Sequence, residues 1–225
     1  MKSHFSEIET LSLDAFKEMD YLAVEKYALP IELMMENAGL QLANLIANSA
    51  NEETEISIGI GNGNNGGGGL VAARRLAAWG FNVYLDMPVE ITKELPKQQL
   101  KRAIRFGAKR KTLLNPDIWV DAYLGFSQRL PLSDIFQKTI RLANASSAYR
   151  IALDIPIGIS DDKNYSGPIF NAHQVLTLAG PKTILKHLPT ETDIRIADIG
   201  IPKAVYKKYK ISMPSFFEHQ IIKLN

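Results

Sequence analysis

The chain opens with two stretches of helical periodicity and continues with short apolar runs. From Ser12 to Ala28, apolar side chains recur every three or four residues, which is typical of an amphipathic helix. A second helical stretch runs from Leu33 to Asn48. The next apolar run, EISIGIG (55–61), is short and rich in β-branched residues, which predicts a strand. The pattern therefore places two helices ahead of the first strand.

Beyond this strand, the pattern predicts an alternation of helices and strands. Further helices are expected at 70–80, 92–107 and 133–146, and a short one begins at Pro202. Strands are expected at 82–88, 118–125, 149–156, 174–180 and 193–202. Because these strands are near-continuous apolar runs, they indicate a parallel sheet that helices bury on both faces. We predict an α/β fold with a three-layer, Rossmann-like, doubly wound and mostly parallel sheet, in a single domain spanning 1–225.

The composition narrows the classes of partner. The net charge is +2, with 46% hydrophobic and 22% charged residues, so we expect no nucleic-acid partner. The chain has no cysteine, which excludes disulfides, thiolate nucleophiles and cysteine-bound zinc. The histidines lack metal-binding spacing; they are His4, His173, His187 and His219. No apolar run approaches the roughly 18 residues of a membrane span, so we expect a cytoplasmic protein without a membrane partner.

A glycine-rich segment, GIGNGNNGGGGL (59–70), follows the first predicted strand. A phosphate-binding P-loop needs lysine and then serine or threonine after its last glycine, but Gly69 and Leu70 stand there. A dinucleotide fingerprint fits better, because the segment contains G-x-G-x-x-G and Asp86 lies where a ribose-binding acid would stand. Asp86 equally suits a turn at the end of a strand, and the extra glycines would delay the helix.

A third interpretation explains more of the same segment. Consecutive glycines allow backbone amides to face an anion, and a helix N-terminus adds its positive end. The side chains of Asn64 and Asn65 can hydrogen-bond a ligand or coordinate a hard cation. Other polar groups also follow predicted strands, among them Asp121, Asp154 and Lys182. Because ligands of doubly wound folds bind beyond the carboxyl ends of strands, we expect at least some of these groups to converge.

Six ordered motifs resemble one family, the NAD(P)HX epimerases, also called the YjeF N-terminal domain. The motifs are LMMENAG, GNGNNGGGGLVAARRL, VDAYLGFS, ALDIPIGIS, LAGPK and DIGIP. They extend over most of the chain, from about Asp14 to Pro202. The resemblance implies a Rossmann-like fold and an isomerase that interconverts the R and S epimers of NADHX and NADPHX in nicotinamide cofactor repair. These hydrated cofactors would be its nucleotide substrates, and a separate NAD(P)HX dehydratase would consume the S form. The resemblance also implies a homodimer and a potassium ion near the substrate.

The resemblance assigns roles to particular residues. As catalytic groups it indicates Asp121 first and Lys182 second, for the proton transfers that inversion at C6 requires. As potassium ligands it indicates Asn65 and Asp121. The substrate-binding residues that it implies are Asn64, Asn65, Gly66, Gly67, Gly68, Gly125, Phe126, Ser127, Gln128, Arg129 and Asp154. Arg129 could pair with a phosphate.

Two positions depart from the family pattern. Gly68 stands where the family has aspartate, which removes a carboxylate from the substrate loop. Ile157 stands where the family has serine, which replaces an oxygen ligand by an aliphatic side chain and weakens the expected potassium site. We therefore expect a stand-alone epimerase with an altered ion site. The alternative is a catalytically weakened relative that binds a nucleotide-like ligand or acts as a protein-interaction module.

Overall fold

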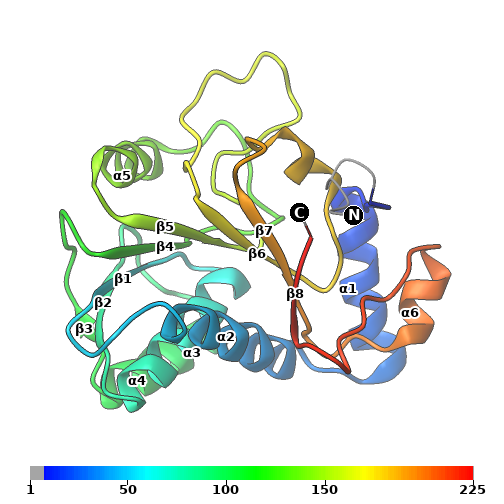
Figure 1. Cartoon of the computed structure of the whole chain (residues 1–225), viewed down its shortest axis with the longest axis horizontal. Helices are drawn as coiled ribbons and strands as arrows, with labels where there is room; N and C mark the ends of the chain where they lie inside the picture. The colour runs from blue at the N-terminus through cyan, green and yellow to red at the C-terminus, as the bar shows by residue number, and fades with distance from the viewer. Residues whose placement is uncertain (1–7, 225) are drawn as a thin grey trace.

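The computed structural model describes residues 8–224 and is built around one eight-stranded sheet (Figure 1). Residues 1–7 and 225, which include His4 and both ends of the predicted domain, lie outside the described residues. The strand order is β3-β2-β1-β4-β5-β6-β7-β8, and every neighbouring pair is parallel except β7 with β8. The strands are β1 (Glu55–Ile60), β2 (Asn82–Asp86), β3 (Lys109–Arg110), β4 (Ile118–Ala122), β5 (Tyr149–Leu153), β6 (Gln174–Leu178), β7 (Asp193–Ala197) and β8 (Ile221–Lys223).

Helices cover both faces of this sheet. Three of them, α2, α3 and α4, pack on one face, whereas α5 lies on the opposite face and α1 and α6 lie side by side at one end (Figure 1). The helices are α1 (Leu13–Tyr27), α2 (Ile31–Ala47), α3 (Asn64–Ala78), α4 (Glu94–Arg105), α5 (Asp134–Ala145) and α6 (Lys203–Lys208), with a 3₁₀ turn η2 (Thr183–His187). The predicted α/β class and mostly parallel sheet are confirmed.

Two separate cores explain why the strands read as continuous apolar runs. In β1, Ile56 and Ile58 face α3 and belong to the core shared with α2 and α4. In β4, Val120 joins that core, while its neighbour Trp119 belongs to the other core with Phe136 of α5. Because successive side chains alternate between two buried faces, both faces of these strands are mostly apolar.

The boundaries differ from the prediction chiefly at α3. We expected this helix to begin at Leu70 after a glycine loop, but it begins at Asn64, with Gly63 as its N-cap. The four glycines are therefore in the helix and not before it. Sequence periodicity also missed β3, β8 and η2, because elements of two to five residues are too short to show a repeat.

Close packing explains the glycines of α3. A Cβ atom at Gly66 would collide with the carbonyl oxygen of Gly61 at the end of β1. A Cβ at Gly69 would come within 2.6 Å of the Ala122 side chain in β4. By contrast, a Cβ at Gly68 would meet only the Leu153 side chain, at 3.3 Å, and Ala38, at 3.8 Å. Glycine is thus required at 66 and 69 for helix–sheet contact, whereas Gly68 has room for a side chain.

This difference predicts unequal effects of two alanine substitutions. Gly66→Ala should lower the free energy of unfolding by about 2 kcal/mol or more, because backbone atoms cannot yield to the new methyl group. Gly68→Ala should change it by less than about 1 kcal/mol, since the helical preference of alanine offsets a slight shift of Leu153. Chemical denaturation of both variants measures this contrast, and equal losses would contradict the packing argument.

Candidate active site

A cleft of about 550 Å³ lies at the carboxyl-terminal edge of the sheet. It opens at the carboxyl ends of the neighbouring strands β1 and β4, the point at which the strand order reverses: β2 and β3 lie beyond β1, and β5 to β8 lie beyond β4. The predicted substrate-binding residues that line it are Asn64, Asn65, Gly68, Gly125, Phe126, Ser127, Arg129 and Asp154. The fold therefore gathers segments that follow β1, β4 and β5 at one place.

Five predicted site residues do not line this cleft: Gly66, Gly67, Gln128, Asp121 and Lys182. Gln128 instead binds the segment after β5, because its Oε1 accepts a hydrogen bond from the Gly158 amide at 2.7 Å. Its Nε2 donates to the Pro156 carbonyl at 3.4 Å. Gly67 packs against Met35 of α2. Gln128 and Gly67 thus support the walls of the cleft from behind.

A buried ion pair lies beside the cleft. The ammonium of Lys182 is 2.7 Å from Oδ1 of Asp154, and the lysine side chain is fully buried. The same ammonium donates to Thr177 Oγ1 at 3.0 Å and to the Leu178 carbonyl at 2.9 Å. Burial lowers the pKa of Lys182, and the negative charge of Asp154 opposes that shift. Lys182 is therefore held rigidly and not solvated.

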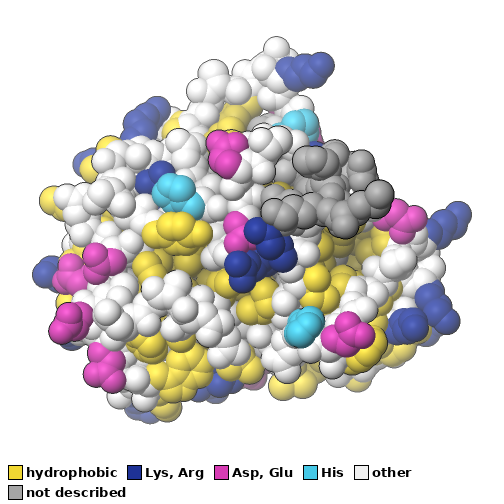
Figure 2. Space-filling model, in the orientation of Figure 1, with side chains coloured by type: hydrophobic (Ala, Val, Ile, Leu, Met, Phe, Trp, Pro, Cys, Tyr) yellow, Lys and Arg dark blue, Asp and Glu magenta, His cyan; other side chains and the backbone are white. Residues whose placement is uncertain are grey.

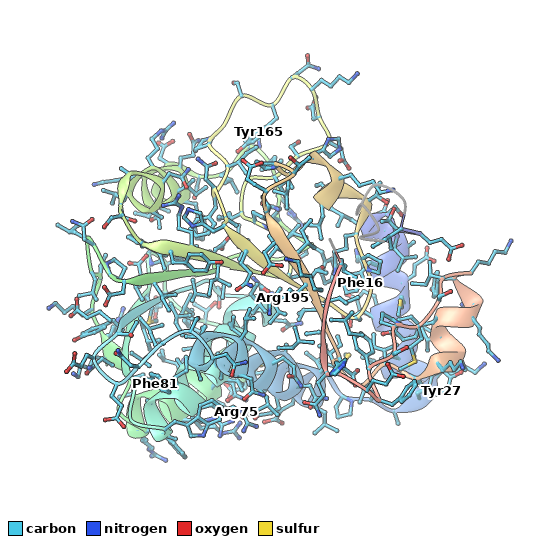
Figure 3. All side chains as sticks on the ribbon, in the orientation of Figure 1. Phe16, Tyr27, Arg75, Phe81, Tyr165 and Arg195 are labelled. Atoms are coloured by element: carbon cyan, nitrogen blue, oxygen red, sulfur yellow. The ribbon has the colours of Figure 1, made fainter. Side chains whose placement is uncertain are left out.

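An aromatic ring covers the Lys182 ammonium, and a loop amide binds the Asp154 carboxylate. Phe16 of α1 lies on the helix face turned towards the sheet (Figure 3), with its ring centroid 3.6 Å from the ammonium of Lys182. Phe126 packs edge-on against Phe16, with ring centroids 5.2 Å apart. The Phe126 amide donates to Oδ2 of Asp154 at 3.1 Å. Asp154 adopts a left-handed backbone conformation, φ 71°, which turns its carboxylate to meet both partners.

Asp121 is fully buried and is held by backbone groups. One carboxylate oxygen accepts a hydrogen bond from the Tyr123 amide at 3.1 Å, and the other accepts one from the Ile157 amide at 2.6 Å. Burial raises the pKa of Asp121 to about 7, although both hydrogen bonds favour its ionised form. The carboxyl group therefore ties the loop after β4 to the loop after β5.

The donor set around Asn65 does not fit a bound potassium ion. Its side-chain amide donates to the carbonyls of Leu124 and Leu153, at 3.1 Å and 3.2 Å. An N–H group thus stands between two oxygens that a cation would need as ligands. The Ile157 side chain is fully buried and offers no oxygen. Within residues 8–224, no group of three or more His, Asp or Glu side chains is placed to hold a metal ion.

Asp86 is engaged inside the protein. It accepts short hydrogen bonds from the hydroxyl of Tyr123 and from that of Thr112, the latter at 2.5 Å. Trp119 in turn donates its indole N–H to the Tyr123 hydroxyl at 3.1 Å. Because Asp86 is buried and both its oxygens have partners, the structure gives no support to a ribose-binding acid at this position.

Sequence analysis missed one whole wall of the cleft. Helix α1 contributes Phe16, Lys17, Asp20 and Tyr21, which lie on one side of the helix. Its periodicity indicated only that one face is buried. The available signal was Asp20, an acidic residue beside the apolar stripe and one turn after Phe16. Burial, reinforced by the charge of Asp154, raises the pKa of Asp20 to about 6.

A second hollow, of about 620 Å³, lies where the strands begin. Acidic and basic side chains adjoin on this part of the surface (Figure 2), where Arg195 is labelled in Figure 3. Asp193 is 2.9 Å from Arg195 and 3.3 Å from Lys223, so one carboxylate is shared by two cations of the protein itself. None of the predicted site residues lines this hollow, and we place the candidate site in the cleft at the opposite edge.

Known proteins resemble the chain over most of its length. A family model described as YjeF-related protein N-terminus matches residues 31–184. The NAD(P)H-hydrate epimerase of Rhodopirellula baltica is 33% identical over 221 residues, which cover 91% of this chain and 90% of the relative. The NAD(P)H-hydrate epimerase of Dehalogenimonas lykanthroporepellens is 34% identical over 212 residues, with coverage of 89% and 86%.

A solved structure shares the fold. The crystal structure of the yeast protein YNL200c has a TM-score of 0.83 and 23% sequence identity, covering 96% of this chain and 100% of that one. This likeness extends over the described sheet and helices. The family match, in contrast, begins after α1, the helix that supplies the wall of the cleft missed by sequence analysis.

The contacts of Asp121 predict a stability defect in Asp121→Asn. Asparagine keeps one acceptor oxygen, and its NH₂ group must face a backbone N–H, which should cost about 1–3 kcal/mol. Ionisation of a carboxyl group whose folded pKa is raised opposes folding. The contribution of Asp121 to the free energy of unfolding of the wild-type protein should therefore fall as pH rises from about 4 to about 7.

Chemical denaturation at several pH values measures both effects. The exposed variant Glu90→Gln is the matched control and should change neither stability nor its pH dependence. In Asp121→Asn, the part of the pH dependence that Asp121 causes should be absent. An Asp121→Asn protein as stable as wild type at neutral pH would contradict a bridging role for this carboxyl group.

Proposed function

The chain belongs to the family of YjeF-related protein N-termini, and from this premise we propose that it is an NAD(P)H-hydrate epimerase. Such an isomerase interconverts the R and S forms of hydrated NADH and NADPH. The proposal is supported by relatives of that name that are about one-third identical over nearly their whole length. The hydrated nucleotide is the substrate, so the protein has no need of a hydride-transfer partner.

The observation that carries the proposal is the position of the Asp154–Lys182 ion pair beside the cleft. C6 of the hydrated ring bears a hydroxyl group next to ring nitrogen, and its inversion requires departure and return of oxygen with matched proton transfers. Asp154 lines the cleft, so its carboxylate can accept a proton from water there, and the Lys182 ammonium fixes its position. The same cleft contains the N-terminus of α3, whose backbone amides favour an anion such as the pyrophosphate of a dinucleotide.

Further charges in the cleft suit a nucleotide. Lys17, Lys93 and Arg129 line it and are exposed, so each can approach a phosphate without leaving a buried partner. NADPHX carries one more phosphate group than NADHX, on a ribose. The three cations can bind the phosphate groups that both substrates share and the additional phosphate of NADPHX.

One observation favours a second candidate function, a weakened relative that binds a nucleotide without turning it over. Gly68 lines the cleft, so the aspartate that the family carries there would face the ligand. Its absence removes a charged group from the site itself. Binding of a nucleotide or of another protein would then be the remaining activity.

We further propose that the epimerase does not depend on potassium. The amide of Asn65 and the buried side chain of Ile157 occupy positions where an ion site would need oxygen atoms. The homodimer, the separate dehydratase and the cytoplasmic location stay predictions from the sequence. No helix among residues 8–224 is long and apolar enough to cross a membrane.

A coupled assay tests the proposed function. Mixed R and S NADHX is supplied to a dehydratase specific for the S form, with and without this protein. We expect the R form to be consumed far faster when the protein is present. Persistence of the R form at the uncatalysed rate would exclude the epimerase.

In that case, two variants distinguish the weakened relative from an unrelated protein. Gly68→Asp restores the family carboxylate at a position with room for a side chain, and Gly68→Asn is its uncharged control. Turnover gained by Gly68→Asp alone would identify the missing carboxylate as the cause. Thermal stabilisation by NADPH without turnover in any variant would favour a binding module.

Potassium independence has its own test. Replacing potassium by tetramethylammonium should change neither the epimerisation rate nor the thermal midpoint of the wild-type protein, because the amide of Asn65 already bridges the carbonyls. Ile157→Ser supplies a hydroxyl oxygen and serves as the comparison. A wild-type rate that falls severalfold without potassium would refute this part of the proposal.

A further inference from the structure

Asp20 is a carboxyl group of the cleft that the residues described by the structure leave without a hydrogen bond or an ion pair. It lies in the middle of α1 and lines the cleft. Among residues 8–224, no hydrogen bond or ion pair engages its carboxylate. A half-buried carboxyl group without a protein partner is costly unless it is protonated or meets a ligand. Its position therefore needs a functional explanation.

The other two carboxyl groups near the site are already engaged. Asp154 is bound by the Lys182 ammonium and by the Phe126 amide. Asp121 is bound by two backbone amides and does not line the cleft. Asp20 is thus the carboxyl group whose oxygens are both available to a bound molecule.

We propose that Asp20 is a catalytic residue that works as the acid opposite the Asp154 base. This inference rests on the proposed epimerase function and extends it, because neither the motifs nor the comparisons assign α1 a role. Asp20 protonates the hydroxyl oxygen on C6, the C6–O bond breaks, and water leaves. The lone pair of ring nitrogen N1 forms a double bond to C6 as the oxygen departs.

In the second half of the reaction, water is added back to the ring. Water adds to the other face of C6, the electron pair of the double bond returns to N1, and Asp154 accepts the proton that the water loses. One water molecule leaves and one enters, so substrate and product have the same composition. Asp154 then releases its proton to solvent and Asp20 takes one up, which returns both carboxyl groups to their starting states. The opposite direction uses the same two groups in exchanged roles.

The charges around Asp20 suit an acid. Desolvation and the negative charge of Asp154 raise the pKa of Asp20 to about 6, and Lys182 acts against that rise. Along the cleft it also shares the space with Lys17, Lys93 and Arg129, all exposed. A carboxylic acid and a carboxylate in one cleft are a usual arrangement for proton transfer in both directions.

Asp20→Asn tests the inference, because asparagine keeps the shape and cannot transfer a proton. We expect kcat for epimerisation to fall about 10²- to 10⁴-fold with KM little changed. The wild-type rate should depend on a group that titrates near pH 6, and that dependence should be absent from the variant. Asp20→Glu should recover part of the rate. The matched control is Glu25→Gln, an exposed carboxyl on the same helix, which should behave as wild type.

The outcomes separate this inference from the proposed function. A wild-type protein without epimerase activity would overturn both. An active wild type with Asp20→Asn within about threefold of its rate would overturn the inference alone. Loss of rate together with loss of thermal stabilisation by NADPH, or with a lowered thermal midpoint, would show a structural role and also overturn it. Removal of a buried charge should leave the midpoint unchanged or higher.

Discussion

The close contact between the start of α3 and the ends of β1 and β4 is the constraint on which the site depends. The helix can begin immediately after β1 only because Gly66 has no side chain to strike the Gly61 carbonyl. Gly69 likewise allows the helix to lie against Ala122 in β4. This contact brings the N-terminus of α3 and its first backbone amides to the carboxyl ends of the neighbouring strands β1 and β4. A larger residue at either position would move the helix and open the cleft floor.

A second set of contacts holds the loops that complete the cleft. Asp121 joins the loops after β4 and β5 through two backbone amides. Asn65 joins α3 to the loop after β4 and to the end of β5 through two carbonyls. Lys182 binds the end of β6 at the Leu178 carbonyl and also forms an ion pair with Asp154. These polar contacts hold the loops in one arrangement. The bridging acid and the reacting acid are consequently different residues.

Helix α1 gives the site its chemical asymmetry. It places Phe16 over the Lys182 ammonium, and it places Asp20 in the cleft that Asp154 also lines. One carboxyl group is thereby paired with a close ammonium, while burial raises the pKa of the other. The two carboxyl groups of the cleft thus differ in their surroundings. The same residues also limit how a nucleotide ring could enter, because aromatic side chains line that wall.

The sequence alone determined the α/β class and the parallel sheet, and it predicted the sheet edge at which the candidate cleft lies, because apolar periodicity and the positions of strand ends are local features. It also identified Asn65, Asp121, Asp154 and Lys182 as important, through motifs whose spacing survives in the chain. Only the tertiary structure decided what each one does. Whether a lysine is solvated or buried, whether a carboxylate faces a cleft or a backbone amide, and whether four glycines form a loop or a helix depend on neighbours remote in sequence. For the same reason Asp20 acquires its role only when α1 packs across the ends of distant strands.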